Sequence, residues 1–178
     1  PFLTTINLTD RITQIGNYAF YRCVSLSVLD IPDSVTYIGE YCFYNCSSIH
    51  SITIPASVTI IKKRTFSYCS RLTSIIFNGN VSELKDYSFE YSTALSYIFY
   101  KGYNEPKITK YSFSKANLNS VDVMNYYEKS TFNGISVRII NSADSMLFKG
   151  TCGENVHYIL DPITGNLTIY GSGQMTNY

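Results

Sequence analysis

"VTYIGEYCFYNCSSIHSITIPAS", residues 35–57, recurs along the chain with a period of 23 residues. The segments that begin at Ile12, Val58 and Val81 align with it without a gap. One position of the unit is always phenylalanine, and another is always leucine or isoleucine. These two columns are Phe20, Phe43, Phe66 and Phe89, and Leu26, Ile49, Leu72 and Leu95. Self-similarity at a fixed period of this length is typical of a solenoid, in which each repeat adds one coil to a stack.

The repeats continue beyond these four units in both directions. Apolar residues within 3–8 lie 23 residues before their equivalents in 26–31, so the chain opens inside a truncated repeat. A weaker fifth unit follows Tyr103, with one residue inserted in "GYNEPK" and one removed later. The sequence therefore predicts a repeat array over residues 1–123 and a degenerate closing segment over 124–140.

Each repeat is expected to contain a strand and a return. In "LSVLDIP", residues 26–32, apolar side chains alternate with outward ones, which is the period of a strand with one buried face. Pro32 and Pro55 end this strand, since proline cannot donate a hydrogen bond to a neighbouring strand. The half from Ile12 to Cys23 predicts a turn into a short helical or 3₁₀ segment. The expected fold class is α/β: a solenoid with a parallel sheet and short helical/3₁₀ returns.

The tail, residues 141–178, has a different pattern. Alternating apolar residues at 156–160 and 167–169 flank the turn-forming stretch "DPITGN". This arrangement predicts a β-hairpin module. The module is either the cap of a second repeat array or an independent small β domain.

The units "ITQIGNYAFYRCVSLSVLDIPDSV" and "VTYIGEYCFYNCSSIHSITIPASV" resemble the BspA-like leucine-rich repeat. That pattern pairs an I-G-x-x-A-F-x-x-C half with an L-x-x-I-x-I-P-x-S half. The resemblance covers about residues 3 to 123 and departs from the pattern at Lys62-Lys63-Arg64-Thr65. It implies a right-handed solenoid with a curved, concave parallel sheet. "MNYYEKSTFNGISVRII" is similar to the segment that closes such arrays, and the tail is similar to a module that precedes them.

The same resemblance implies a function. BspA-like proteins are typically secreted or exposed on the cell surface and are implicated in adhesion to host cells, matrix or other microbes. We therefore expect a non-enzymatic adhesion module with a protein or glycan ligand on host cells or matrix. The alternative is a structural spacer that projects other domains of a larger surface protein.

Composition narrows the function classes further. The formal net charge of +1 among 178 residues provides no field to attract nucleic acid. No run of eighteen apolar residues is present, so we expect no insertion into a membrane. The chain begins at Pro1 without a signal-like segment, and we expect it to be a piece of a longer protein. The exposed edge of the truncated first repeat is an expected site of self-association.

Cysteine and histidine spacing suggests a metal site only when one repeat is viewed alone. Cys42, Cys46 and His50 are four residues apart, as zinc ligands can be. Cys46 aligns with Cys23, Cys69 and then Ser92, whereas the positions equivalent to Cys42 and His50 hold alanine, serine or threonine. A metal site would not lose its ligands from one repeat to the next, so we expect neither a metal nor a cofactor. Buried free thiols are expected in preference to a ladder of disulfides. The two histidines, His50 and His157, match no catalytic motif, so we expect no enzyme.

Binding residues are expected on the outward positions of the strands, which form two columns on the concave face. The candidates are Val28, Asp30, Ser51, Thr53, Ser74, Ile76, Tyr97 and Phe99. Exposed aromatic and aliphatic side chains at Ile76, Tyr97 and Phe99 would serve as anchors, because such residues dominate binding energy at interfaces. The alternative is that these three pack under the inserted loop or the terminal module.

A second column contains tyrosine at the start of the return. Its members are Tyr18, Tyr41, Tyr87 and Tyr111, with Arg64 interrupting them. We expect a stacked tyrosine ladder that supports the convex face, and the alternative is a ridge that contacts sugar or protein. The adjacent basic cluster, Lys62 to Arg64, is either a solvated loop or a contact for sulfated glycans.

Overall fold

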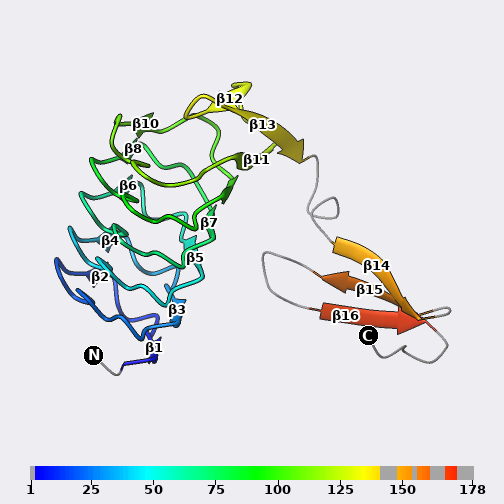
Figure 1. Cartoon of the computed structure of the whole chain (residues 1–178), viewed down its shortest axis with the longest axis horizontal. Helices are drawn as coiled ribbons and strands as arrows, with labels where there is room; N and C mark the ends of the chain where they lie inside the picture. Colours follow the sequence, from blue (N-terminus) through cyan, green and yellow to red (C-terminus); the bar gives the residue numbers. More distant parts are fainter. Residues whose placement is uncertain (1–2, 141–147, 154–155, 161–166, 172–178) are drawn as a thin grey trace. The chain divides into compact units, whose positions relative to one another are not determined.

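The computed structural model describes residues 3–140, 148–153, 156–160 and 167–171, with side chains described for residues 3–140. The chain divides into two compact units, Pro1–Ile139 and Ile140–Tyr178. The first unit contains the stacked coils and the second a small antiparallel sheet (Figure 1). The finer division at residues 123 and 140 stays a prediction.

Each coil of the first unit contributes one strand to a parallel array along one edge (Figure 1). These strands are β1 (Thr5–Asn7), β3 (Val28–Asp30), β5 (Ser51–Ile54), β7 (Ser74–Phe77), β9 (Tyr97–Tyr100) and β11 (Ser120–Met124). Strands β1 and β3 form a two-stranded sheet. Strands β5, β7, β9 and β11 belong to a six-stranded sheet that is completed by β13 (Ile135–Ile140) and β12 (Thr131–Phe132). The register joins Ser51, Ser74, Tyr97 and Ser120, which confirms the 23-residue period.

A second set of short strands follows the opposite edge of the coils. These strands are β2 (Gln14–Ile15), β4 (Tyr37–Ile38), β6 (Ile60–Ile61), β8 (Glu83–Leu84) and β10 (Lys107–Ile108). Strand β2 pairs with β4, and β6, β8 and β10 form a parallel three-stranded sheet. The sequence predicted only one strand per repeat. The second edge was not predicted, because strands of two residues leave no alternating pattern of apolar residues.

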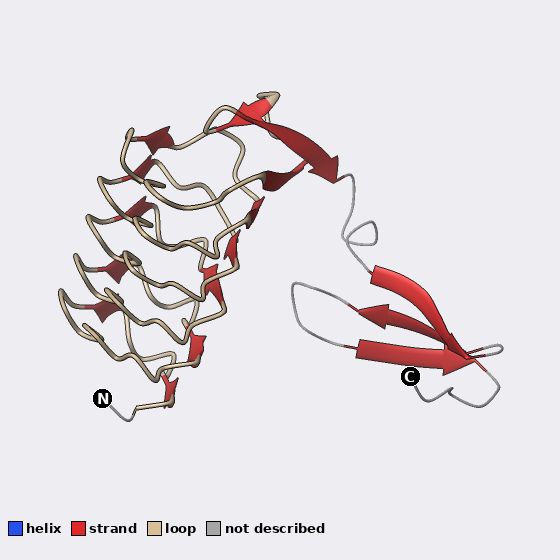
Figure 2. Ribbon diagram, viewed as in Figure 1, coloured by secondary structure: helices blue, strands red, loops and turns tan. Residues whose placement is uncertain are grey.

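The predicted helical returns are wrong: no helix occurs in the described residues, and each return is a series of turns (Figure 2). The backbone N–H groups alternate in direction. Those of Tyr18, Phe20 and Arg22 donate to carbonyls of the next coil at 2.8–3.0 Å. Those of Tyr21 and Cys23 close local turns three residues back. A helix would keep all these bonds within one coil, whereas here the returns help to hold neighbouring coils together.

Positive φ angles explain why the return cannot become a helix. Two residues in each of the first four returns adopt the left-handed conformation, for example Tyr18 (φ 59°) and Arg22 (φ 59°) in the first coil. The equivalents in the next coil are Tyr41 (φ 55°) and Asn45 (φ 57°). This conformation costs about 1–2 kcal/mol for a residue with a β-carbon and stops helix propagation.

The core lies between the two edges and is built on the phenylalanine column. Each ring stacks on the ring of the next coil, with centroids 5.2–5.5 Å apart and planes within 7° of parallel. The stack consists of Phe20, Phe43, Phe66, Phe89 and Phe113. Aromatic contacts of this kind add about 0.5–1.5 kcal/mol beyond the burial of apolar area.

The far end of the array is closed by β12 (Thr131–Phe132) and β13 (Ile135–Ile140), which pair antiparallel. Phe132 and Tyr127 pack against the fully buried ring of Tyr100. The Tyr100 hydroxyl donates to the carbonyl of Asn104 at 2.7 Å, which ties the inserted loop to the core. Among the described segments, no helix is long and apolar enough to span a membrane.

The second unit contains β14 (Phe148–Gly153), β15 (Val156–Leu160) and β16 (Leu167–Gly171). The three strands form an antiparallel sheet in this order. The stretch predicted to turn between β15 and β16, residues 161–166, lies outside the described residues. The predicted hairpin module therefore stays a prediction.

Candidate binding surfaces

The sheet face brings most of the predicted binding residues into two registered columns. Ser51, Ser74 and Tyr97 are neighbours across β5, β7 and β9. Thr53, Ile76 and Phe99 form the parallel column, two residues further along each strand. Val28 and Asp30 lie on β3, in the separate two-stranded sheet with β1. The columns follow from the strand period of two, which places alternate side chains on one face.

Accessibility differs along these columns. Val28 is 58% exposed, and Asp30 and Ser51 are also exposed. The other accessible candidates are half-buried: Thr53, Ser74, Ile76 and Tyr97. A face of small polar side chains with two larger groups, Ile76 and Tyr97, is therefore available to a ligand.

Phe99 is not an exposed anchor, and that prediction is wrong. Its side chain is 0% exposed. In the sheet it lies between Ile76 on β7 and Asp122 on β11, and Lys101 Nζ lies 5.4 Å from its ring centroid. The outward position on a strand is thus covered by its neighbours, which strand alternation alone does not reveal.

Asp122 is the centre of a polar cluster beside Phe99 that sequence analysis did not identify. Its carboxylate is 2% exposed and accepts hydrogen bonds from Arg138 Nε at 2.8 Å and Arg138 Nη2 at 2.6 Å. The Tyr97 hydroxyl donates to the same carboxylate at 3.0 Å. Burial and the nearby Asp122 charge raise the pKa of Tyr97, so the phenol stays protonated. Tyr97 is consequently oriented by the protein and has its hydroxyl already engaged.

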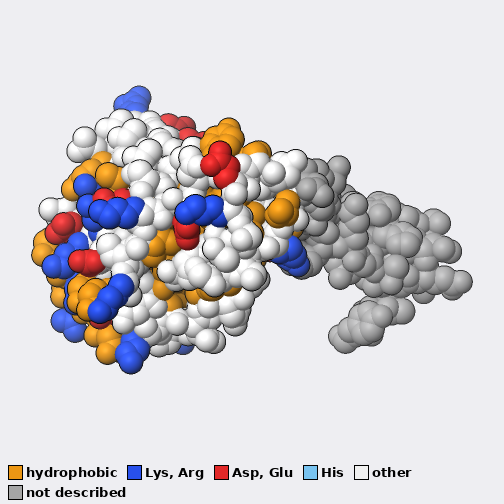
Figure 3. All heavy atoms as spheres, turned by 90° about the horizontal axis from the view of Figure 1, so that it is seen from above, with side chains coloured by type: hydrophobic (Ala, Val, Ile, Leu, Met, Phe, Trp, Pro, Cys, Tyr) orange, Lys and Arg blue, Asp and Glu red, His pale blue; other side chains and the backbone are white. Residues whose placement is uncertain are grey.

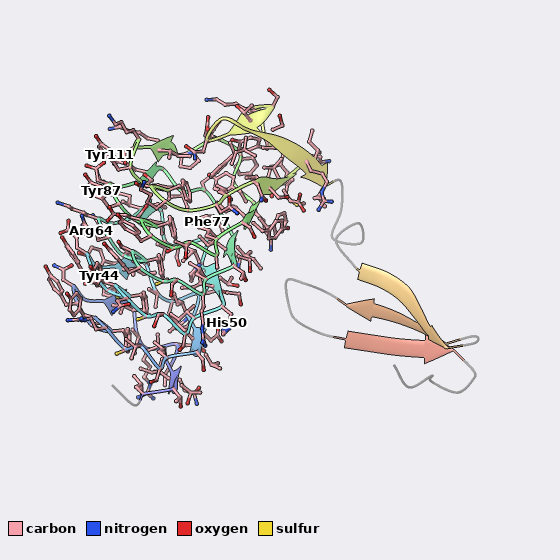
Figure 4. All side chains as sticks on the ribbon, in the orientation of Figure 1. Tyr44, His50, Arg64, Phe77, Tyr87 and Tyr111 are labelled. Carbon is pink, nitrogen blue, oxygen red and sulfur yellow. The ribbon has the colours of Figure 1, made fainter. Side chains whose placement is uncertain are left out.

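The opposite edge carries a row of tyrosines, interrupted at Arg64 and here called the tyrosine ridge. Its members lie in the returns of successive coils: Tyr18, Tyr21, Tyr41, Tyr44, Tyr68, Tyr87, Tyr91 and Tyr111. Figure 4 shows Tyr44, Tyr87 and Tyr111 on this edge, with His50 on the other. Sequence analysis identified half of these residues as a ladder, and the structure places Tyr18 on Tyr41 and Tyr87 on Tyr111 at 5.1 Å.

The ridge is wider than the predicted column because stacking crosses between columns. Tyr21 stacks on Tyr44 at 5.1 Å, and Tyr44 then contacts Tyr68 at 5.3 Å, although these two belong to different positions of the repeat. Tyr68 stacks on Tyr91 at 4.7 Å. The recurring "YxFY" of the first two returns was the available sequence signal.

Arg64 replaces a tyrosine within the ridge and stacks on Tyr87 of the next coil. Its guanidinium carbon lies 4.5 Å from the ring centroid of Tyr87, and its Nη1 donates to Glu90 Oε2 at 2.7 Å. Lys110 Nζ lies 4.9 Å from the ring centroid of Tyr111. Cations above aromatic faces contribute about 0.5–1 kcal/mol at exposed sites, so these basic groups have fixed places along the ridge.

Cysteines of the repeats at residues 35–57 and 58–80 are part of the interior. Cys42, Cys46 and Cys69 are buried and free. Cys46 Sγ donates to the carbonyl of Phe20 at 3.1 Å, and Cys69 Sγ donates to that of Phe43 at 3.2 Å. Ser92 occupies the same position in the next coil and donates to Phe66 at 2.9 Å. Burial, followed by the neighbouring thiol, raises the pKa of Cys42 and of Cys46 to about 12, which makes these thiols poor nucleophiles and poor metal ligands at neutral pH.

Comparison with known families agrees with this architecture. The sequence model of the BspA type leucine rich repeat region matches residues 2–119 with six copies. The chain belongs to this family. The match ends close to the last parallel strand, β11, so the leucine-rich repeats account for the stacked coils.

One solved structure shows the same fold. It is that of a leucine rich cell surface protein from Faecalibacterium prausnitzii A2-165, which is 24% identical to this chain with a TM-score of 0.61. The alignment covers 67% of this chain and 32% of that one. A leucine-rich repeat protein from Bacteroides ovatus ATCC 8483 is 25% identical with a TM-score of 0.38, over 72% of this chain and 28% of that one. The chain thus spans about a third of these proteins. No curated protein sequence matches the chain.

Proposed function

We propose that the repeat array is a non-enzymatic cell-surface adhesion module that binds a protein of host cells or matrix through its sheet face. Membership of the BspA-type family supports a surface role with macromolecular ligands. The surface location is proposed by analogy with the F. prausnitzii protein, which is described as a cell surface protein.

The observation that carries the proposal is the registered pair of columns on β5, β7 and β9. Thr53 lies opposite the half-buried Ile76, and Ser74 lies between Ser51 and the half-buried Tyr97, with all five in fixed register. A rigid surface of this kind loses little conformational entropy on binding, because its backbone is already held by pairing between coils. Small polar side chains beside a few larger groups match the distribution of binding energy at protein interfaces, where a few residues dominate.

Binding of the purified chain to epithelial cells and to immobilised matrix proteins tests the proposal. The variant S51R/S74R places two bulky cations on the sheet face and leaves Tyr97 and its hydrogen bond intact. The matched control, T13R/T59R, places the same cations on exposed residues at the opposite edge. Circular dichroism and thermal unfolding would check that both variants fold.

Saturable binding that is lost in the sheet-face variant and kept in the control is the expected result. Binding that survives in the sheet-face variant would exclude the sheet face. Absence of saturable binding by the parent chain would favour the alternative, a spacer that holds other domains away from the cell surface.

A further inference from the structure

We propose that the tyrosine ridge is a second binding surface and that its ligand is an extended acidic polysaccharide, carboxylated or sulfated, that runs across the coils. The proposal concerns a different edge of the array from the sheet face and a different class of ligand.

The stacking of the rings determines which parts of the ridge tyrosines are accessible to a ligand. Stacked rings such as Tyr18 and Tyr41, with planes 12° apart, cover each other's faces. The faces are therefore closed to sugar rings, while the ring edges and hydroxyls remain at the surface. Ring edges carry partial positive charge. A ligand that presents many acceptor oxygens complements these groups better than an apolar ligand does.

The hydroxyls of the ridge are available. Other tyrosines of the described chain use theirs within the protein: Tyr97 donates to Asp122, Tyr100 to Asn104 and Tyr127 to Thr131. Within residues 3–140, none of the eight ridge hydroxyls has a protein hydrogen-bond partner. Burial of Tyr44 among its neighbours raises its pKa, which keeps that phenol in the donating form. The ridge thus presents a row of unused donors.

Backbone conformation makes the tyrosines harder to explain by packing alone. Tyr18, Tyr41, Tyr68, Tyr87 and Tyr91 all have positive φ, between 55° and 63°. Asparagine or glycine fits such positions at lower cost, and asparagine does occupy one at Asn45. Ring stacking offsets this cost, but phenylalanine would stack equally well, as it does in the core. The hydroxyl is what tyrosine adds.

Charge favours an acidic ligand over a neutral one. The five returns, residues 17–23, 40–46, 63–69, 86–92 and 110–116, contain the ridge and eight charged residues. The basic ones are Arg22, Lys63, Arg64, Lys110 and Lys115, and the acidic ones are Glu40, Asp86 and Glu90. Glu90 is already engaged by Arg64. At left in Figure 3, basic side chains are intermixed with hydrophobic ones, the class that includes tyrosine, and with a few acidic ones.

Ridge length predicts the size of ligand required. Five coils separated by about 5 Å give a surface about 20 Å long. Affinity should therefore rise with the length of an oligosaccharide until it spans the five coils, and then level off. A single anion-binding pocket would show no such dependence on length.

Calorimetric titration of the purified chain with size-defined heparin and hyaluronan oligosaccharides tests the proposal, with maltooligosaccharides as the neutral probe. We expect binding to at least one acidic series, with affinity rising from disaccharide to about hexasaccharide and falling with added salt. Failure of both acidic decasaccharides to bind at millimolar concentration would overturn the proposal. Equal binding to the neutral series would overturn the acidic class.

Substitution of tyrosine by phenylalanine locates the site, because it removes hydroxyls and keeps the stacked rings. The variant changes the five most exposed ridge residues: Tyr18, Tyr21, Tyr68, Tyr91 and Tyr111. Loss of several hydrogen bonds should weaken binding at least about tenfold. The control Y103F/Y126F changes exposed tyrosines outside the ridge and should bind normally. Normal binding by the five-fold variant would overturn the proposal.

Paired charge variants separate a defined site from general attraction to polyanions. K63Q/K115Q removes two exposed charges in the returns, and R11Q/K129Q removes two outside them. We expect a loss of affinity in the first variant alone, whereas equal losses in both would overturn the assignment to the ridge. Because this assay uses isolated glycans, its result is independent of whether the sheet face binds a host protein.

Discussion

Arg138 on β13 binds the buried carboxylate of Asp122 on β11 through two hydrogen bonds, 2.8 Å from Nε to Oδ1 and 2.6 Å from Nη2 to Oδ2. The Tyr97 hydroxyl supplies a third, at 3.0 Å. One buried acid therefore joins β9, β11 and β13, and connects the closing strand to the last parallel strands of the array. Without Arg138 this carboxylate would keep a single donor in a position that is 2% exposed.

Arg138→Ala should accordingly lower the free energy of unfolding by about 2 kcal/mol, since charged hydrogen bonds contribute about 1.5–3 kcal/mol each and the pair is partly open to water. Urea denaturation followed by circular dichroism would measure the change. Arg11→Ala removes an exposed arginine that is distant in sequence from Arg138, and it serves as the control. Equal stability of the two variants would show that Asp122 does not depend on Arg138.

Gly16 and Gly39 occupy the same repeat position but differ in what lies beside them. A β-carbon on Gly39 would come within 2.4 Å of the backbone nitrogen of Asn17, while one on Gly16 would meet nothing within 4 Å. Gly39→Ala should therefore cost about 1–3 kcal/mol, because backbone of the preceding coil must move. Gly16→Ala should change stability by less than about 0.5 kcal/mol.

Thermal unfolding of both glycine variants checks this difference. The comparison isolates the effect of coil stacking, because the two residues share the same local sequence context. A similar loss in both would mean that glycine is needed for local backbone conformation and not for the close approach of neighbouring coils.

Much of the fold could be predicted from the repeat. Because side chains at equivalent positions must pack on each other in a stack, the spacing of Phe20, Phe43, Phe66 and Phe89 was sufficient to assign the register. The returns could not be predicted in the same way. Helix propensity reflects interactions within one segment. It does not include the hydrogen bonds that the N–H groups of Tyr18 and Phe20 donate to the next coil, and these bonds favour turns over a helix.

The binding surfaces were predictable only in part, since they depend on contacts between positions of the repeat. Phe99 lies at an outward position of its strand, where an exposed side chain is expected, yet neighbouring residues bury it. The tyrosine ladder was visible as one column, but Tyr44 and Tyr68 are 24 residues apart, and their contact joins two different columns of the repeat. Aligned positions of the repeat predict contacts between equivalent residues of neighbouring coils. They do not predict contacts between residues at different positions of the repeat.

Alkaline pH should destabilise the protein through its buried thiols. The pKa of Cys46 rises from 9.0 to about 12 on folding, chiefly because of burial. Below pH 9 the thiol is protonated in both states, and between pH 9 and 12 only the unfolded chain releases its proton. The free energy of unfolding therefore falls as pH rises through this window, by about 1.4 kcal/mol per pH unit for each such thiol.

Cys46→Ser should reduce this slope by the contribution of one thiol, because serine does not titrate in this range. Ser92 shows that a hydroxyl can make the equivalent bond to a phenylalanine carbonyl. Urea denaturation at pH 8, 9 and 10 in a C152S background would give the slopes. Identical slopes for the parent and the variant would contradict the raised pKa of Cys46.

The phenylalanine stack gives a prediction about cooperativity along the coils. Phe66 is fully buried and has stacked partners on both sides, at 5.3 and 5.5 Å. Phe113, at the end of the stack, is half-buried and has one partner, Phe89, at 5.2 Å. Phe66→Ala should cost about 3–5 kcal/mol, the range for deleting a buried phenylalanine, and Phe113→Ala clearly less.

The two substitutions should also differ in the shape of the unfolding curve. In a solenoid each coil is stabilised by its neighbours, so a weakened central coil separates the array into two parts, whereas a weakened end coil frays. Phe66→Ala should therefore lower the denaturant dependence of unfolding or produce two transitions, while Phe113→Ala should shift a single transition. Urea unfolding monitored by circular dichroism and by tyrosine fluorescence distinguishes these outcomes. A single, equally steep transition for both variants would mean that the coils unfold as one unit, with the backbone bonds between returns maintaining the coupling that the missing ring no longer provides.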